Sequence, residues 1–456
     1  MFPGSIETGT VALFPLFPLK PELLADDLLP LSCLWYLWRA VIDCDIVIIG
    51  SGPAGTSTAL HLLTHDPTLA GEILLLDKAV HPRDKICAGG LIPHTLDCLR
   101  ELEIPLSVPH VAVDRAYVRV PPGREVFCDD GGMCSVIRRD EFDFSLVQAA
   151  RERGAVLREG EKVLELRREQ GRILVVTETE TFRARVVVGA DGSGSRVRRQ
   201  LVGECDTAVG KALMCDIPVA ATAWEGFAQR RYDFNFLPVS QGLKGYLWEF
   251  PCLIQGEPHI NVGIYSLGDT HLTNADLQRL LSAEVEGLRG QGPGSQMQNA
   301  KCKTQNFTIC NPQAAIRNVK FRAFPINGYT PGVSLAAPNV VLVGDAAGAE
   351  PLMGEGISFA LEYGKFAAQS ITRALQTQRF EFEDYTAYIA QSWLGKKLAR
   401  LHFATRLFYG GTRRFWFALA ARNRRLQSIG LKWYNGVDGW QEKSRRDAFR
   451  AVLFSR

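Results

Sequence analysis

Short apolar runs that end in glycine or aspartate recur along this chain of 456 residues. The first clear run is Cys44–Gly50, and Glu72–Asp77 has the same character, so each has the length of a buried strand. Residues 54–63 lie between them and predict a helix, which completes a βαβ unit. Two later runs, Arg185–Gly189 and Asn339–Gly344, predict further strands. The pattern favours an α/β fold.

Three stretches depart from this pattern. From about residue 205 to 330, apolar and polar residues alternate between Gly and Pro turns, which predicts antiparallel strands. From Gly354 onward the periodicity is mostly helical. Residues 1–42 are rich in proline, leucine and aromatic residues without a sustained period, and we interpret them as an amino-terminal extension.

A glycine-rich turn joins the first expected strand to the first expected helix. It consists of Gly50, Ser51, Gly52, Pro53, Ala54 and Gly55, in the spacing G-x-G-x-x-G. Such glycines allow a tight turn and let a pyrophosphate approach the N–H groups at a helix N-terminus. Asp77, followed by Lys78, ends the second strand 22 residues after Gly55, where a carboxylate accepts hydrogen bonds from a ribose. The turn therefore predicts a dinucleotide site.

Two later segments favour a flavin over a nicotinamide dinucleotide. Residues 189–198 read Gly-Ala-Asp-Gly-Ser-Gly-Ser-Arg-Val-Arg, and residues 344–357 open with Gly-Asp and end with Gly-Glu-Gly-Ile. With the turn, they resemble the three fingerprints of the p-hydroxybenzoate-hydroxylase-like flavoproteins. The resemblance implies that Asp345 holds the ribityl chain of FAD. It also implies that a helix starting near Gly354–Gly356 points at the pyrimidine edge of the flavin, where the reduced ring carries negative charge. The expected cofactor contacts in these segments are Asp191, Gly344, Asp345, Gly354, Gly356 and Ile357.

Arg139 belongs to a further element of this kind. It precedes Phe142 and Asp143, and the spacing resembles the Arg-x-x-Phe-Asp element of the same flavoproteins, whose arginine lies near the FAD. From the residues alone, Arg138 and Arg139 could also be solvated at the start of a helix.

Two segments resemble the geranylgeranyl reductases within this superfamily. Residues 82–90, Pro-Arg-Asp-Lys-Ile-Cys-Ala-Gly-Gly, resemble that family's Pro-Arg-x-Lys-x-Cys-Gly-Gly segment, which implies places for Arg83 at the FAD and for Cys87 at the flavin or the substrate. Residues 246–251, Tyr-Leu-Trp-Glu-Phe-Pro, resemble its Tyr-x-Trp-x-Phe-Pro tract. The resemblance covers roughly residues 43–380. Ala88 replaces a frequent glycine, and Gly263 stands where the family often has Gly-x-Gly; both departures bear on the substrate.

The resemblance implies a Rossmann-like, discontinuous FAD-binding domain with an inserted antiparallel-sheet substrate domain and a helical carboxyl-terminal region. The expected segments are an extension at 1–42, the first part of the FAD-binding domain at 43–204 with a small substrate-domain segment near 91–137, the substrate domain at 205–330, the second part of the FAD-binding domain at 331–380, and a basic helical region at 381–456.

An isolated carbon–carbon double bond is reduced by hydride from the flavin and a proton. Because the alkene has no polar handle, a long apolar tunnel has to position it. Tyr246, Trp248 and Phe250 alternate as on one face of a strand and could line such a tunnel; aromatic residues at this period also form ordinary cores. We expect Cys87 to contact the substrate rather than to act as a nucleophile, and no catalytic acid or base can be assigned.

Composition excludes several other classes. Hydrophobic residues make up 46% and charged residues 22% of the chain, which gives ample material for a core. Eleven cysteines stand without C-x-x-C pairs, which is typical of a reducing, cytoplasmic protein, and no metal site is expected. No run approaches the ~20 apolar residues of a membrane-spanning helix. Without a second dinucleotide loop, we expect NAD(P)H or reduced ferredoxin to donate electrons without a dedicated nicotinamide domain.

Charge is concentrated at the carboxyl end. Residues 395–456 hold 15 Lys and Arg against 3 Asp and Glu, while the remainder of the chain has a net charge of −9. Arginines and aromatic residues, Trp416 among them, interleave between Arg413 and Arg425, which suits an anionic membrane surface. A solvated helix packed on the FAD-binding domain is the alternative, and no nucleic acid is expected.

The leading hypothesis is an FAD-dependent oxidoreductase that reduces isoprenoid double bonds and contacts a membrane peripherally. A flavin monooxygenase or a halogenase-like enzyme of the same fold, acting on an apolar or aromatic substrate, is the alternative. A flavin-binding lipid carrier is a non-enzymatic reading that would leave Cys87 and the aromatic residues without a role.

Overall fold

The computed structural model describes residues 41–288 and 320–423, except 122, 205–208 and 222–223, together with 427, 430, 431, 434 and 435. The chain forms two units, Met1–Val41 and Ile42–Arg456, and the second is described below. The expected extension at 1–42 and most of the basic region beyond residue 423 lie outside the described residues. The proposed domain boundaries stay predictions.

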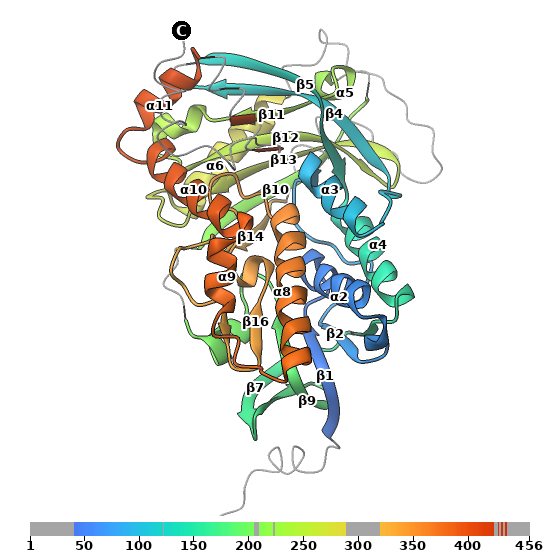
Figure 1. Cartoon of the computed structure of the whole chain (residues 1–456). Helices are drawn as coiled ribbons and strands as arrows, with labels where there is room; N and C mark the ends of the chain where they lie inside the picture. The colour runs from blue at the N-terminus through green and yellow to red at the C-terminus, as the bar shows by residue number, and fades with distance from the viewer. Residues whose placement is uncertain are drawn as a thin grey trace, which may run out of the picture. The chain divides into compact units, whose positions relative to one another are not determined.

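The first sheet is built around parallel strands (Figure 1). Its order is β15-β16-β9-β1-β2-β6, and the antiparallel strands β7 and β8 extend it from β9. Ile46–Ile49 pair with Ile73–Leu76, and all eight of these residues are buried, which is why both runs are continuously apolar. The strands are β1 (Val41–Ile49), β2 (Ile73–Asp77), β6 (Val156–Glu159), β7 (Val163–Glu169), β8 (Arg172–Thr177), β9 (Thr181–Gly189), β15 (Ala336–Ala337) and β16 (Val340–Leu342).

Helices α2 (Pro53–His65) and α8 (Ile357–Thr377) lie side by side against this sheet (Figure 1). Ser57 Oγ donates a hydrogen bond of 2.7 Å to the Leu361 carbonyl oxygen. A Cβ on Gly364 would stand 2.6 Å from Ser57 Oγ, so the helices approach closely because residue 364 has no side chain. α3 (Pro93–Glu101) and α4 (Arg139–Glu152) complete this helical group.

The second sheet is mainly antiparallel, with the order β14-β10-β13-β12-β11-β4-β5-β3. One face carries a cluster of aromatic residues, and the other is packed by α6 (Asn274–Leu288). Its strands are β3 (Gly90–Leu91), β4 (His110–Val120), β5 (Arg124–Ile137), β10 (Gly210–Pro218), β11 (Arg231–Asn235), β12 (Gly245–Ile254), β13 (Glu257–Ser266) and β14 (Arg322–Ile326). Short helical turns lie at Pro67–Leu69, Arg198–Val202, Glu225–Ala228, Leu237–Gln241 and Gly344–Ala346.

The helical carboxyl end consists of α9 (Tyr385–Gln391), α10 (Trp393–Phe408) and α11 (Arg413–Ala420). The expected α/β fold with a helical carboxyl-terminal region is confirmed. The expectation that Trp416 faces a membrane surface is wrong, because its side chain is buried beside Phe408, with ring centroids 6.3 Å apart. Among the described helices, none is long and apolar enough to cross a membrane.

Candidate active site

The glycine-rich turn has the geometry of a pyrophosphate cradle. Gly50 has a φ of +104°, and a Cβ there would stand 2.3 Å from the Ala190 carbonyl oxygen. A Cβ on Gly55 would stand 1.9 Å from the Gly50 carbonyl oxygen, so α2 can begin this close to β1 only with glycine. Gly52 caps α2, and a Cβ on Gly52 would meet only the Arg83 guanidinium, at 3.5 Å. The turn therefore leaves room at Gly52 in front of a helix N-terminus.

Asp77 at the end of β2 is tied to the same turn. The backbone N–H and the hydroxyl of Ser51 donate to Asp77 Oδ2 at 2.9 and 2.7 Å, and the N–H of Ala79 donates to Oδ1 at 2.9 Å. Burial raises the pKa of Asp77, but these hydrogen bonds and the nearby Arg83 outweigh it, so the pKa lies below its usual value. Asp77 thus holds the turn in place as well as lining the cavity, and Lys78 is exposed beside it.

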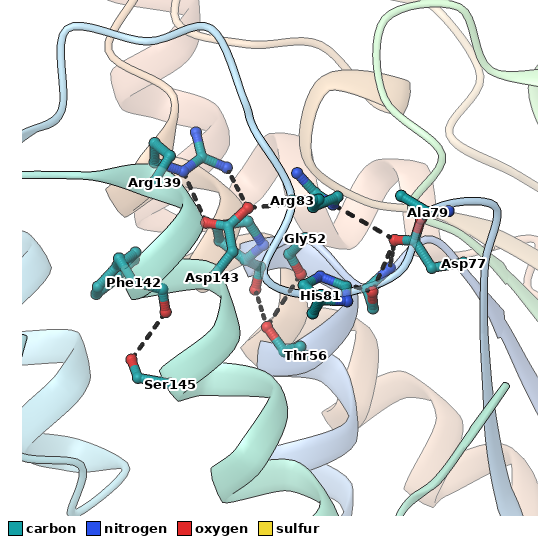
Figure 2. A network of polar contacts seen from close by, with 12 residues as sticks. Gly52, Thr56, Asp77, Ala79, His81, Arg83, Arg139, Phe142, Asp143 and Ser145 are labelled. Atoms are coloured by element: carbon teal, nitrogen blue, oxygen red, sulfur yellow. Dashed lines mark hydrogen bonds and ion pairs between the residues drawn. The ribbon is translucent and has the colours of Figure 1, made fainter. Parts of the chain in front are cut away.

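Two arginines share one buried carboxylate (Figure 2). Arg139 Nε and Nη2 donate to the two oxygens of Asp143 at 2.7 and 2.9 Å. Arg83 Nη2 lies 3.2 Å from Asp143 Oδ2, and Arg83 Nε lies 3.9 Å from Asp77 Oδ2. Asp143 is fully buried, so it fixes both guanidinium groups at the cavity wall. The sequence did not assign Asp143 a role, although its position four residues after Arg139 is typical of a helical ion pair.

Asp191 and Asp345 have different surroundings. Asp191 Oδ1 accepts from the Ser195 hydroxyl at 2.5 Å and Oδ2 from the Arg196 N–H at 2.6 Å, so its carboxylate mainly orders its own loop. Burial raises its pKa, although these hydrogen bonds oppose the rise. Asp345 accepts from the Ser193 hydroxyl at 3.1 Å and lines the cavity. Asp345 is therefore the better placed of the two to bind a polyol chain.

Helix α8 begins where the sequence predicted, with Gly356 as its cap and Ile357 as its first residue. Glu355, which the sequence did not single out, accepts hydrogen bonds from the N–H groups of Ile357 and Ser358 at 3.1 and 3.0 Å. Two N–H groups of the first turn are thus bonded within the chain. The carboxylate also weakens the positive potential that this helix end offers to a reduced flavin.

A cavity of about 710 Å³ joins these loops to the aromatic face of the second sheet. This volume lies within the range of small-molecule and cofactor sites. Two of the expected residues, Ser51 and Gly55, do not line the cavity. Ser51 contacts Asp77, and Gly55 lies against the Gly50 carbonyl oxygen. The expected residues that line the cavity are Gly50, Gly52, Pro53, Ala54, Asp77, Lys78, Arg83, Cys87, Arg139, Asp191, Gly344, Asp345, Gly354, Gly356, Ile357, Tyr246, Trp248 and Phe250.

The aromatic end of the cavity is held rigidly. The Tyr246 hydroxyl donates to the Met353 carbonyl oxygen, and Trp248 Nε1 donates to Asn261 Oδ1 at 2.7 Å. Phe250 packs on Tyr232, with ring centroids 5.0 Å apart. Burial raises the pKa of Tyr246 well above its usual value, so its hydroxyl stays protonated. These rings belong both to the core and to the cavity wall, so the two interpretations of the tract are compatible.

The cavity is also lined by side chains that the sequence did not reveal as site residues, among them Lys85, Tyr265 and Tyr434. Lys85 Nζ lies 2.9 Å from the centroid of the Phe324 ring, and burial, with the nearby Arg139 charge, lowers its pKa to about 8. Tyr265 follows Gly263 on the same face of β13, and this alternation could have identified it. Tyr434 reaches the wall from the carboxyl-terminal region, and no local signal predicts that.

The cavity residues fit FAD. The open position at Gly52 and the two guanidinium groups suit a pyrophosphate, while Asp77 and Asp345 offer acceptors for hydroxyl groups. The far end is apolar and suits a ring system with its substrate. Cys87 lies between the two ends, half-buried, and its sulfur accepts from the Gly89 N–H at 3.4 Å.

Sequence comparisons agree with this assignment. The family model described as an FAD binding domain matches residues 43–375. An uncharacterised protein of Methanosarcina barkeri is 31% identical, over 80% of this chain and 84% of its own. A digeranylgeranylglycerophospholipid reductase of Methanothrix thermoacetophila is 28% identical over 78% of this chain and 85% of its own. A menaquinone reductase of Mycolicibacterium smegmatis is 28% identical over 72% and 76%.

Solved structures share the fold. A geranylgeranyl bacteriochlorophyll reductase-like protein of Thermoplasma acidophilum superposes with a TM-score of 0.68 at 18% identity, covering 91% of this chain and all of the other. The flavin-dependent brominase Bmp2 superposes with a TM-score of 0.65 at 16% identity, covering 90% and 98%. Because the family model spans most of the chain and the cavity residues fit its cofactor, this chain belongs to the FAD binding domain family and is an FAD-dependent oxidoreductase related to the geranylgeranyl reductases.

Proposed function

We propose that the protein reduces isolated carbon–carbon double bonds of an isoprenoid chain of the geranylgeranyl type. The observation that carries this proposal is one continuous cavity, with a glycine-rich cradle at one end and a buried aromatic wall at the other. Relatives named for geranylgeranyl lipids support the choice of substrate class.

FAD supplies hydride to the alkene when it is bound in its reduced form. When FAD is bound, Gly52, Arg83 and Arg139 would hold its pyrophosphate, and Asp345 would hold its ribityl chain. Tyr246, Trp248 and Tyr265 orient the alkene by shape, because it offers no group for a hydrogen bond. The rings also exclude water from the reacting carbons.

Lys85 is our candidate for the proton source. It lines the cavity, and with a pKa of about 8 its Nζ holds a proton near neutral pH that it can release more readily than an exposed lysine. The proton adds to the carbon opposite the hydride, and solvent then reprotonates the amine. The electron donor, NAD(P)H or reduced ferredoxin, stays a prediction.

The basic carboxyl-terminal helices suit a substrate that resides in a membrane. Between residues 395 and 422 the chain holds Lys and Arg but no Asp or Glu. Phe403 on α10 and Phe415 on α11 are 51% and 55% exposed. Phe417 of α11 packs on Phe236, which packs on Tyr246 of the cavity wall, with ring centroids 5.5 and 5.4 Å apart. We propose that α10 and α11 contact an anionic membrane through their basic residues and exposed Phe403 and Phe415, next to the substrate end of the cavity.

A flavin monooxygenase or halogenase-like activity is the second candidate. The observation that favours it is the shared fold with the brominase Bmp2 and with p-nitrophenol 4-monooxygenase PnpA from Pseudomonas putida, the latter at a TM-score of 0.61. Such an enzyme would use oxygen, whereas a reductase of alkenes would not.

The experiment compares products with and without oxygen. The flavin is reduced, geranylgeranyl diphosphate is added in the absence of oxygen, and the products are identified by mass. We expect flavin reoxidation and a gain of two hydrogens per double bond. Flavin that stays reduced until oxygen enters, followed by a hydroxylated product, would favour the monooxygenase.

A further inference from the structure

We propose a zinc site formed by His94 and Cys98 of α3 and Glu362 of α8. The sequence predicted no metal site, because Glu362 lies far from the other two residues along the chain. His94 and Cys98 are four residues apart and therefore share one face of α3, a spacing that helices use to present two metal ligands. The packing of α3 beside α8 supplies the third ligand.

The three donor atoms already lie at the separations that zinc requires. Glu362 Oε1 is 3.0 Å from His94 Nε2 and 3.6 Å from Cys98 Sγ, and the sulfur is 3.8 Å from His94 Nε2. A point equidistant from these atoms lies about 2.0 Å from each, close to zinc–nitrogen and zinc–oxygen bonds and slightly short of the ~2.3 Å zinc–sulfur bond. A small shift of the ion out of the plane of the three donor atoms lengthens the zinc–sulfur distance and leaves the other two within the usual range.

The surroundings suit an ion with three protein ligands and one open coordination position. Cys98 and Glu362 are buried, whereas the His94 side chain is 17% exposed, which gives an entry path and a position for a water molecule as fourth ligand. The Trp393 ring packs on the His94 ring with centroids 4.8 Å apart and restricts its orientation. Nitrogen, thiolate and carboxylate are the ligand set that zinc prefers in proteins.

Zinc binding changes the protonation of the cluster. Without an ion, His94 Nε2 lies 3.0 Å from Glu362 Oε1, and the Cys98 thiol donates a hydrogen bond to the same oxygen. With zinc, the Cys98 thiol releases its proton to solvent, and the ion bonds the thiolate, a neutral imidazole nitrogen and the carboxylate. No electron transfer is involved.

The ion would cross-link α3 to α8, the helix whose first residue lines the flavin end of the cavity. The expected effect is therefore on thermal stability, not on the chemistry of the cavity. This inference is independent of the proposed reaction.

The test measures metal in the full-length protein, purified without an affinity tag and then equilibrated with zinc and freed of excess ion. We expect about one zinc per chain and an X-ray absorption spectrum with one sulfur neighbour at about 2.3 Å. Chelation should lower the melting temperature while FAD content stays the same.

Substitutions locate the ion. Cys98→Ser and Glu362→Gln should each lose the bound zinc, whereas Cys44→Ser, which removes a half-exposed cysteine of β1, should keep it. Less than a tenth of an equivalent in the wild-type protein after zinc loading, with no sulfur neighbour, would overturn the proposal. So would equal zinc content in Cys98→Ser and the wild type.

Discussion

The indole ring of Trp248 on β12 lies over Gly263 on β13, where a Cβ on residue 263 would stand 2.1 Å from the ring. The two residues are direct partners across the strands, so the position of the Trp248 ring depends on the absence of a side chain at residue 263. Asn261, two residues before Gly263, accepts the indole N–H at 2.7 Å. Strand β13 thus positions the Trp248 ring in two ways, because Gly263 leaves room for its face and Asn261 binds its N–H group.

Gly263→Ala should therefore displace Trp248 and impair the substrate wall. We expect turnover of a geranylgeranyl substrate to fall about tenfold or more, because misplacement of a reacting group by about 1 Å is costly. FAD content should not change, because the cofactor loops lie elsewhere. Gly287→Ala in α6, where the added methyl group meets open space, is the matched control. Loss of FAD together with activity would show that the ring is needed for the core alone.

Asp345→Ala should weaken FAD binding. Removing a carboxylate that pairs with buried hydroxyl groups costs about 1–3 kcal/mol, which corresponds to about a 5- to 150-fold higher dissociation constant. Fluorescence titration of the FAD-free protein with FAD measures this dissociation constant. Asp269→Ala removes an exposed carboxylate in the second sheet's periphery and should bind FAD like the wild type. Unchanged affinity in Asp345→Ala would remove this residue from the site.

The lowered pKa of Lys85 predicts how the rate of alkene reduction depends on pH. Its pKa is lowered to about 8 by burial, so the protonated form that donates is present below this pH and is lost as the pH rises through it. The rate of alkene reduction should therefore fall above about pH 8. Lys85→Arg keeps the positive charge but holds its proton too tightly, so the rate should fall about a hundredfold or more and lose this pH dependence. An unchanged profile in the variant would assign the proton to another group.

The basic helices should bind anionic vesicles in a salt-dependent way. Arg413→Glu with Arg414→Glu should weaken binding at least about tenfold, because each basic residue near an anionic leaflet contributes about 1 kcal/mol. The attraction should fade with salt as the Debye length shrinks. Arg100→Glu with Arg279→Glu makes the same charge change at exposed positions of α3 and α6 and is the control. If both pairs of substitutions behave alike, the attraction comes from net charge and not from this face.

Local sequence was sufficient to identify most of the residues that line the glycine-rich end of the cavity. Gly50 and Gly55 are needed because two backbones approach closely there, and such positions leave a fixed spacing in the sequence. Asp345 and the start of α8 were implied by the resemblance to flavoproteins, and both lie at the cavity. The fold of the parallel sheet followed from its continuously apolar strands.

The remaining site residues depend on contacts between distant segments. Tyr434 and Lys85 meet the cavity only after both sheets are assembled, and Glu355 bonds the helix end that was expected to point at the flavin. Trp416 was misplaced because an aromatic residue among arginines has the same pattern whether it faces a membrane or packs on a neighbouring helix. Tertiary packing distinguishes these two environments of Trp416, whereas sequence periodicity cannot.

The most direct test of the proposed reaction is the stoichiometry of a single anaerobic turnover. Reduced enzyme is mixed with a geranylgeranyl lipid in slight excess, flavin oxidation is followed by absorbance, and the lipid product is analysed by mass. The account predicts one double bond saturated for each flavin oxidised, and slower oxidation in Gly263→Ala. A flavin that stays reduced while the lipid is recovered unchanged would contradict it.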